Sequence, residues 1–184
     1  NMFAEFAQRR GYDLRPWMPV LTGRVVGDAV QSERFLSDFR RTIADLIADN
    51  HYGVLAEVAE EFGMVMYAEA AGTDLPTTVD GIQAKGRVDI PMGEYWVYPE
   101  GSAPKPNHVA DIREAASASH IYGRNLVAAE ALTTMGEAPW AIGRAQLRPI
   151  VDRFFAEGVN RMVLHTSAHQ PFTDRRPGIT LRQY

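Results

Sequence analysis

Apolar positions follow one plan three times along the chain: an amphipathic helix, a glycine, and a short apolar strand that ends in a polar residue. In the first repeat, apolar side chains recur at helical spacing over residues 35–47, and Ser32 is the expected N-cap. A second helical stretch over residues 55–62 leads to Gly63, which we expect at the C′ position.

The strand of each repeat is a short continuous apolar run of three to five residues. The predicted strands, each with the polar residue that follows it, are 64–68 with Glu69, 126–129 with Glu130, and 162–164 with His165. The helix before the second strand is expected to start at Asn107 as N-cap and to end at Gly123, and the third helix ends at Gly158.

A long polar stretch, residues 72–105, separates the first repeat from the second. It contains a further strand candidate at residues 87–91, followed by Glu94, Tyr95 and Trp96 in a predicted loop. A connection of this length in a compact domain is usually functional.

Continuous rather than alternating apolar strands are typical of parallel sheets that helices cover. Repeated α/β units indicate either a doubly wound sheet or a (β/α)8 barrel. No Gly-x-Gly-x-x-Gly follows a strand and no phosphate-binding Gly-Lys-Ser/Thr loop occurs, which lowers the odds of a nucleotide-binding sheet. We therefore predict an α/β fold in which residues 1–184 form one domain, a partial (β/α)8 TIM-type barrel with outer helices.

Composition narrows the function further. The chain of 184 residues carries a net charge of −4 without a basic cluster, which argues against nucleic acid or an anionic membrane as partner. Cysteine is absent, which excludes disulfides and thiolate metal sites, and no apolar run reaches the length of a membrane span. The first residue, Asn1, is not a methionine, so we expect an internal fragment of a larger protein.

Glutamates at strand ends are the main candidates for chemistry. In parallel β/α folds the carboxyl ends of the strands share the face where active sites lie, so Glu69, Glu130 and Glu94 are expected to converge there. Glycoside cleavage uses two carboxyl groups, one protonated as acid and one ionised as base or nucleophile. Each glutamate taken alone also fits a helix cap or a surface residue.

Aromatic and histidine side chains near these positions suit a sugar ligand. Tyr67, Tyr95 and Trp96 are predicted to stack on sugar rings, although such residues also fill cores. His165 and His169 have the spacing of a zinc pair on a helix, but His165 ends a strand, so we expect hydrogen bonds to substrate instead. The metal ligands, if any, are not identified by the sequence.

Several segments, in order along the chain, resemble the bacterial α-L-rhamnosidases of glycoside hydrolase family 106. They are GYDLRP at 11–16, PVLTGRVV at 19–26, FRRTIAD at 39–45, ASHIYG at 118–123, VAAEA at 127–131, GVNR at 158–161 and HTSAHQP at 165–171. The resemblance implies an exported multidomain enzyme with a (β/α)8 catalytic barrel, which removes terminal α-linked L-rhamnose from plant polysaccharides or glycosides with inversion. It also implies an association with Ca²⁺ and no organic cofactor.

Inversion requires a water between base and sugar, so the two carboxyl groups are expected about 6.5–9.5 Å apart. On that basis we assign Glu69 as general acid and Glu130 as general base, with Glu94 as a rival for either role. Two alternatives remain open: a retaining β-galactosidase-like glycosidase, and a non-catalytic carbohydrate-binding barrel.

Overall fold

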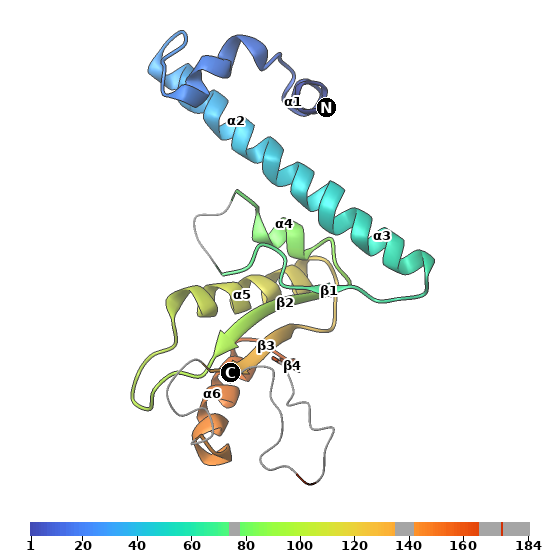
Figure 1. The fold of residues 1–184 in the computed structure, drawn as a ribbon, viewed down its shortest axis with the longest axis vertical. Coiled ribbons are helices and arrows are strands. Elements are labelled where there is room, and N and C mark those ends of the chain that lie inside the picture. The colour runs from blue at the N-terminus through green and yellow to red at the C-terminus, as the bar shows by residue number, and fades with distance from the viewer. Residues whose placement is uncertain (74–77, 135–141, 166–173, 175–184) are drawn as a thin grey trace.

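The computed structural model describes residues 1–73, 78–134, 142–165 and 174 (Figure 1). Their helices are α1 (Met2–Arg10), the 3-10 helix η1 (Arg15–Thr22), α2 (Ala29–Ile47), the π-helical turn η2 (Ala48–Gly53), α3 (Val54–Glu61), α4 (Gly81–Lys85), α5 (Pro106–Ile121) and α6 (Arg144–Ala156). The strands are β1 (Tyr67–Ala68), β2 (Ile90–Trp96), β3 (Ala128–Thr133) and β4 (Arg161–Leu164).

The four strands form one sheet in the order β1-β2-β3-β4, and every pair is parallel. A strand order that follows the chain order is that of a (β/α)8 barrel, whereas a doubly wound sheet reverses direction at a switch point. The structure therefore confirms the predicted α/β fold with parallel strands, in the arrangement of a partial barrel.

The two faces of the sheet contact different parts of the structure. On the outer face, Tyr95 of β2 and Ala129 of β3 pack with Ile112 of α5 and Phe154 of α6 in the largest buried cluster. The rings of Tyr95 and Phe154 are stacked with centroids 4.1 Å apart. Alternate residues of β2 and β3 point to the inner face, where Met92 packs with Ile90, Ala128 and Val163.

A long rod, formed by α2, η2 and α3 in succession, crosses above the sheet in Figure 1. At its N-terminal end an aromatic cluster with its own core forms around Phe6 and Phe35, both of which are buried. At η2, Ala48 is fully buried and packs with Ala84 of α4, which lies between the rod and the sheet. The rod thus connects the aromatic cluster to the sheet region.

Several predicted boundaries need correction. The helix predicted over residues 35–47 is α2, which begins at Ala29 with Asp28 as its N-cap. Ser32 lies inside α2, where its hydroxyl donates to the carbonyl of Val26. Helix α5 begins at Pro106, so Asn107 is not its N-cap. Gly63 does lie in the left-handed conformation (φ 66°) after α3, as predicted for a C′ glycine.

The strands are also displaced from their predicted positions. The first is shorter than expected, and the strand predicted at residues 87–91 is instead β2, which continues to Trp96. Glu94 and Glu130 therefore lie within strands rather than beyond their ends. This follows from alternation: a strand buried on its outer face tolerates polar groups on an inner face that opens into a site.

Candidate active site

Three glutamates converge on the inner side of the sheet. Glu94 of β2 and Glu130 of β3 are direct partners in the strand register, and Glu69 follows β1 immediately. One carboxylate oxygen from each lies within 4.8 Å of the others, and all three side chains are half-buried. The predicted convergence of Glu69, Glu94 and Glu130 is thus present in the structure.

The clustering has an electrostatic consequence for Glu69. Burial, together with the negative charges of Glu130 and Glu94, raises the pKa of its carboxyl group from 4.5 to about 7. A carboxyl group with this pKa holds its proton in a large fraction of molecules at neutral pH. Such a group is suited to donate a proton to a leaving oxygen.

Hydroxyl groups orient the other two carboxylates. Thr73 donates a hydrogen bond from Oγ1 to Oε1 of Glu94 (2.6 Å), and Thr133 donates from its hydroxyl to Oε1 of Glu130. Glu94 and Glu130 therefore each have one carboxylate oxygen held by a threonine hydroxyl.

Two residues beside the site adopt a left-handed backbone that side chains with a Cβ rarely take. Ala71 (φ 78°) lies two residues after Glu69, and Leu132 (φ 64°) lies two residues after Glu130. At Leu132 the register between β2 and β3 skips one position, so that Trp96 pairs with Thr133. Backbone strain of this kind tends to occur at functional sites.

Behind the glutamates lies a buried ion pair that the sequence patterns did not single out. Lys85 of α4 is fully buried and forms a 2.8 Å ion pair with Asp111 of α5. The signal was present: Asp111 lies on the helix face that also carries His108, Ile112 and Ala115, all of them buried. A charged residue on the apolar face of a predicted helix needs a buried partner.

The predicted sugar-binding aromatics are distributed differently from expectation. Tyr95 belongs to the outer-face core and is 0% exposed, so its predicted contact with a ligand is wrong. Trp96 is half-buried in β2, where its ring meets His108 edge-on and Lys105 lies 4.7 Å from the ring centroid. Tyr67, on β1 two residues before Glu69, is 55% exposed.

Of the two histidines that the sequence pairs by spacing, the structure describes only His165. His165 follows β4 directly and is half-buried, which agrees with its predicted place after a strand. His169 lies outside the described residues, so its predicted contact with substrate stays a prediction.

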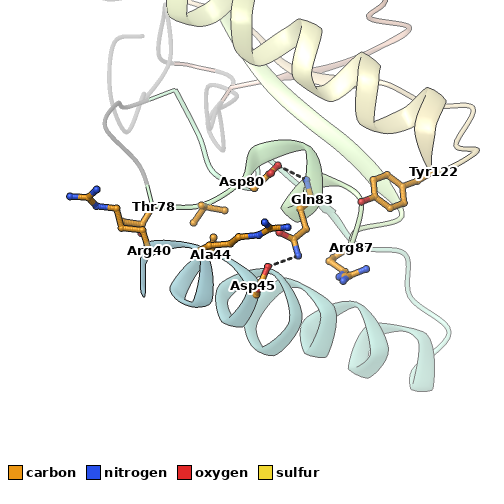
Figure 2. A pocket seen from close by; sticks show the side chains of 10 residues that line it. Arg40, Ala44, Asp45, Thr78, Asp80, Gln83, Arg87 and Tyr122 are labelled. Atoms are coloured by element: carbon orange, nitrogen blue, oxygen red, sulfur yellow. Dashed lines mark hydrogen bonds between the residues drawn. The ribbon is translucent and has the colours of Figure 1, made fainter. Parts of the chain in front are cut away.

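A cleft of about 930 Å³ lies away from the glutamates, between α2 and α4 (Figure 2). Its walls carry Arg40, Asp45, Gln83 and Tyr122, and Gln83 donates a hydrogen bond across it to Asp45. None of the three glutamates lines this cleft. We place the candidate chemistry at the glutamates because three carboxyl groups converge there and the pKa of Glu69 is raised to about 7.

Comparison with known proteins identifies the family. A family model described as alpha-L-rhamnosidase, that of glycoside hydrolase family 106, matches residues 1–184. The chain belongs to glycoside hydrolase family 106. The resemblance seen in the sequence is thereby confirmed over the whole chain.

The solved structure of a rhamnosidase from Novosphingobium sp. PP1Y is similar to this family 106 chain. It superposes with a TM-score of 0.93 at 45% sequence identity, over 99% of this chain and 17% of the rhamnosidase. A protein of Formosa agariphila named "Putative beta-glucuronidase" is 37% identical over 180 residues, which is 97% of this chain and 14% of that protein. The family 106 chain thus spans less than a fifth of the length of either relative.

No helix among the described residues of the family 106 chain is long and apolar enough to cross a membrane.

Proposed function

We propose that this chain forms part of the catalytic barrel of a longer, exported enzyme that hydrolyses terminal α-L-rhamnosides in plant polysaccharides or glycosides. The observation that carries the proposal is the convergence of Glu69, Glu94 and Glu130 on adjacent parallel strands, with the pKa of Glu69 raised to about 7. Membership of family 106 and the likeness to a rhamnosidase support the choice of sugar.

In the proposed reaction Glu69 is the general acid. Its carboxyl group holds a proton near neutral pH because burial and two neighbouring carboxylates disfavour ionisation. It donates that proton to the glycosidic oxygen as the bond to the anomeric carbon breaks, which removes the need to expel an alkoxide.

Glu130 is the proposed general base, and its spacing from Glu69 limits how it acts. Oxygens of Glu69 and Glu130 lie within 4.8 Å, closer than the roughly 6.5–9.5 Å that an inverting reaction needs. Their strands are two positions apart, however, which places the backbones roughly 10 Å from each other. Rotation of the Glu130 side chain away from Glu69 therefore leaves room for a water, whereas Glu94 is only one strand from either.

The same close spacing favours a second candidate. Retaining glycosidases hold their two carboxyl groups about 5–5.5 Å apart, with one acting as nucleophile. The alternative of a retaining β-galactosidase-like enzyme therefore has a specific observation in its favour, the carboxylate spacing of this structure. NMR of the sugar first released from the full-length protein separates the two: the inverted anomer supports the proposal and the retained anomer supports the alternative.

Calcium is implied by the family resemblance, and the three carboxylates fit it. Carboxylate oxygens bind Ca²⁺ at 2.3–2.6 Å, so two ligands of one ion lie up to about 5 Å apart. The oxygens of Glu69, Glu94 and Glu130 meet that limit. Bound there, the ion would supply positive charge to hold sugar hydroxyls. It would also keep Glu69 ionised, so a molecule with Ca²⁺ on all three carboxylates would lack the protonated Glu69 that the proposed reaction uses.

The test of the proposed function uses the full-length protein and phenyl α-L-rhamnoside, an aryl substrate whose poor leaving group needs a proton. We expect release of L-rhamnose, and its loss in Glu69→Gln and Glu130→Gln. Tight binding of L-rhamnose that survives both substitutions, with no turnover by the wild type, would favour the non-catalytic carbohydrate-binding barrel instead.

A further inference from the structure

The side chain of Lys85 has no access to solvent and ends in a set of three acceptors. Its Nζ donates to the carbonyl oxygen of Ala70 (2.7 Å), to Oδ1 of Asp111 (2.8 Å) and to Oε2 of Glu114 (3.4 Å). Ala70 directly follows Glu69. The lysine therefore fixes the backbone at the first of the three clustered glutamates.

Asp111 continues the connection to the second glutamate. Its other oxygen, Oδ2, accepts a hydrogen bond from the backbone N–H of Glu94 (2.8 Å). The approach is open only because residue 93 is glycine: a Cβ there would lie 2.7 Å from Oδ2 of Asp111. One continuous path of hydrogen bonds thus runs from Ala70 through Lys85 and Asp111 to Glu94, and spans β1 and β2 from behind.

Stability alone does not account for this arrangement. A buried ion pair of this kind is often no more stabilising than apolar residues of the same volume, because both charges lose their hydration. The pair does hold backbone positions. Lys85 donates to the carbonyl of Ala70, which adjoins Glu69, and Asp111 accepts from the N–H of Glu94. Catalysis depends on reacting groups that neighbouring residues hold in a fixed geometry.

We propose that Lys85 and Asp111 are positioning residues that set the relative placement of Glu69 and Glu94. The proposal rests on the proposed glycosidase function and assigns a role to two residues that do not themselves meet the sugar. Since the pair lies behind the sheet, its loss alters the orientation of the reacting groups and leaves the sugar contacts in place. The expected signature is a fall in kcat with little change in KM.

The experiment compares Lys85→Met and Asp111→Asn in the full-length protein. Methionine has about the length of lysine without its donors, and asparagine keeps the shape of Asp111 but accepts at only one of its two oxygen positions. We expect kcat to fall about a hundredfold for Lys85→Met and less for Asp111→Asn, with KM within about threefold of the wild type, the size of effect that a displacement of about 1 Å produces.

Two matched controls separate positioning from general damage. Arg113→Gln breaks an exposed ion pair with Glu157 on the same helix as Asp111 and is expected to leave kcat unchanged. Phe35→Leu removes core volume from the distant aromatic cluster, and it is expected to lower the melting temperature while kcat at 25 °C is kept.

A third control, Gly81→Ala, tests the role of Glu114. A Cβ at Gly81 would lie 2.0–2.2 Å from the carboxyl group of Glu114, a flexible side chain that is able to swing out. Gly81→Ala therefore displaces Glu114 from Lys85 but leaves the bonds to Ala70 and Asp111. We expect kcat close to that of the wild type, because the path between the two glutamates is intact.

The outcomes are separable from those of the proposed function. If the wild type releases no sugar, the proposed function fails, and crystal structures of the wild type and Asp111→Asn decide the positioning role: a displaced Glu94 backbone supports it and an unmoved one overturns it. If the wild type is active, unchanged kcat in Asp111→Asn overturns it, as does an equal loss in Arg113→Gln. If Lys85→Met does not fold, Asp111→Asn carries the test alone.

Discussion

Removal of the acidic proton of Glu69 tests the core of the proposed chemistry. We expect Glu69→Gln to reduce kcat/KM strongly for rhamnosides with a poor leaving group, whose departing oxygen needs a proton. Activated substrates, such as a dinitrophenyl rhamnoside, leave without protonation and are expected to lose much less. Glutamine keeps the volume of the side chain, so the change isolates the proton.

The magnitude follows from the raised pKa. At pH 7 a carboxyl group with a pKa of about 7 is protonated in about half of the molecules, whereas one at 4.5 is protonated in roughly 0.3%. The setting of Glu69 thus increases the competent fraction about 150-fold at that pH. General acid catalysis contributes about 10²–10⁴-fold, which bounds the expected loss in Glu69→Gln with a poor leaving group.

The assay is a pH profile of kcat/KM from pH 5 to 9 for the wild type and Glu69→Gln. Activity of the wild type is expected to fall as the pH rises through about 7, because Glu69 then loses its proton. That descending limb is expected to vanish in the variant. A limb that persists at the same pH in Glu69→Gln would refute the assignment of Glu69 as the acid.

Four further results are expected. Gly93→Ala brings a Cβ to 2.7 Å from Oδ2 of Asp111 and 3.1 Å from its carbonyl, so we expect lower kcat and about 1–3 kcal/mol lower stability in thermal unfolding; an unchanged melting temperature would contradict the close packing. Calorimetric titration with Ca²⁺ is expected to show affinity that weakens below pH 7 and in Glu130→Gln, and a pH-independent affinity would place the ion elsewhere. Tyr95→Phe is expected to leave KM and the melting temperature unchanged, because the buried hydroxyl has no hydrogen-bond partner among the described residues; a raised KM would restore Tyr95 to the ligand site. The folded state raises the pKa of Glu69 above its unfolded value of 4.5, so the protonated side chain favours folding fully below pH 4.5, and this contribution is lost as the pH rises through 7. Glu69→Gln is therefore expected to be up to about 3 kcal/mol more stable to unfolding than the wild type at pH 9 and equally stable at pH 4. The same stability difference at both pH values would contradict this linkage.

The sequence predicted the repeating units well because helix periodicity and glycine caps are local signals. Gly63, for example, follows α3 in a left-handed conformation, which glycine adopts easily because it has no Cβ. The convergence of Glu69, Glu94 and Glu130 was also predictable, since parallel strands bring their equivalent ends to one side.

Strand limits and side-chain direction were not predictable in the same way. Tyr95 follows Glu94 directly, and alternation sends neighbouring residues to opposite faces, one to the core and one to the site. The position was predicted as a loop because it lies in the long polar stretch 72–105, whereas in the structure it belongs to β2, where Gly93 leaves room for Asp111. The partner of Asp111, Lys85, lies 26 residues away in sequence, a pairing that tertiary structure alone creates.

The π-helical turn η2 gives the rod a property that an uninterrupted α-helix would lack. A wider turn holds one more residue than an α-helical turn, and each residue advances an α-helix by about 100°. The extra residue therefore resets the phase of α3 relative to α2, and within the turn Tyr52 accepts a hydrogen bond from the N–H of Ala71, beside Glu69. Deletion of one residue from 48–53 would rotate α3 about the axis of the rod relative to α2. This short segment is therefore expected to tolerate substitutions far better than changes in length.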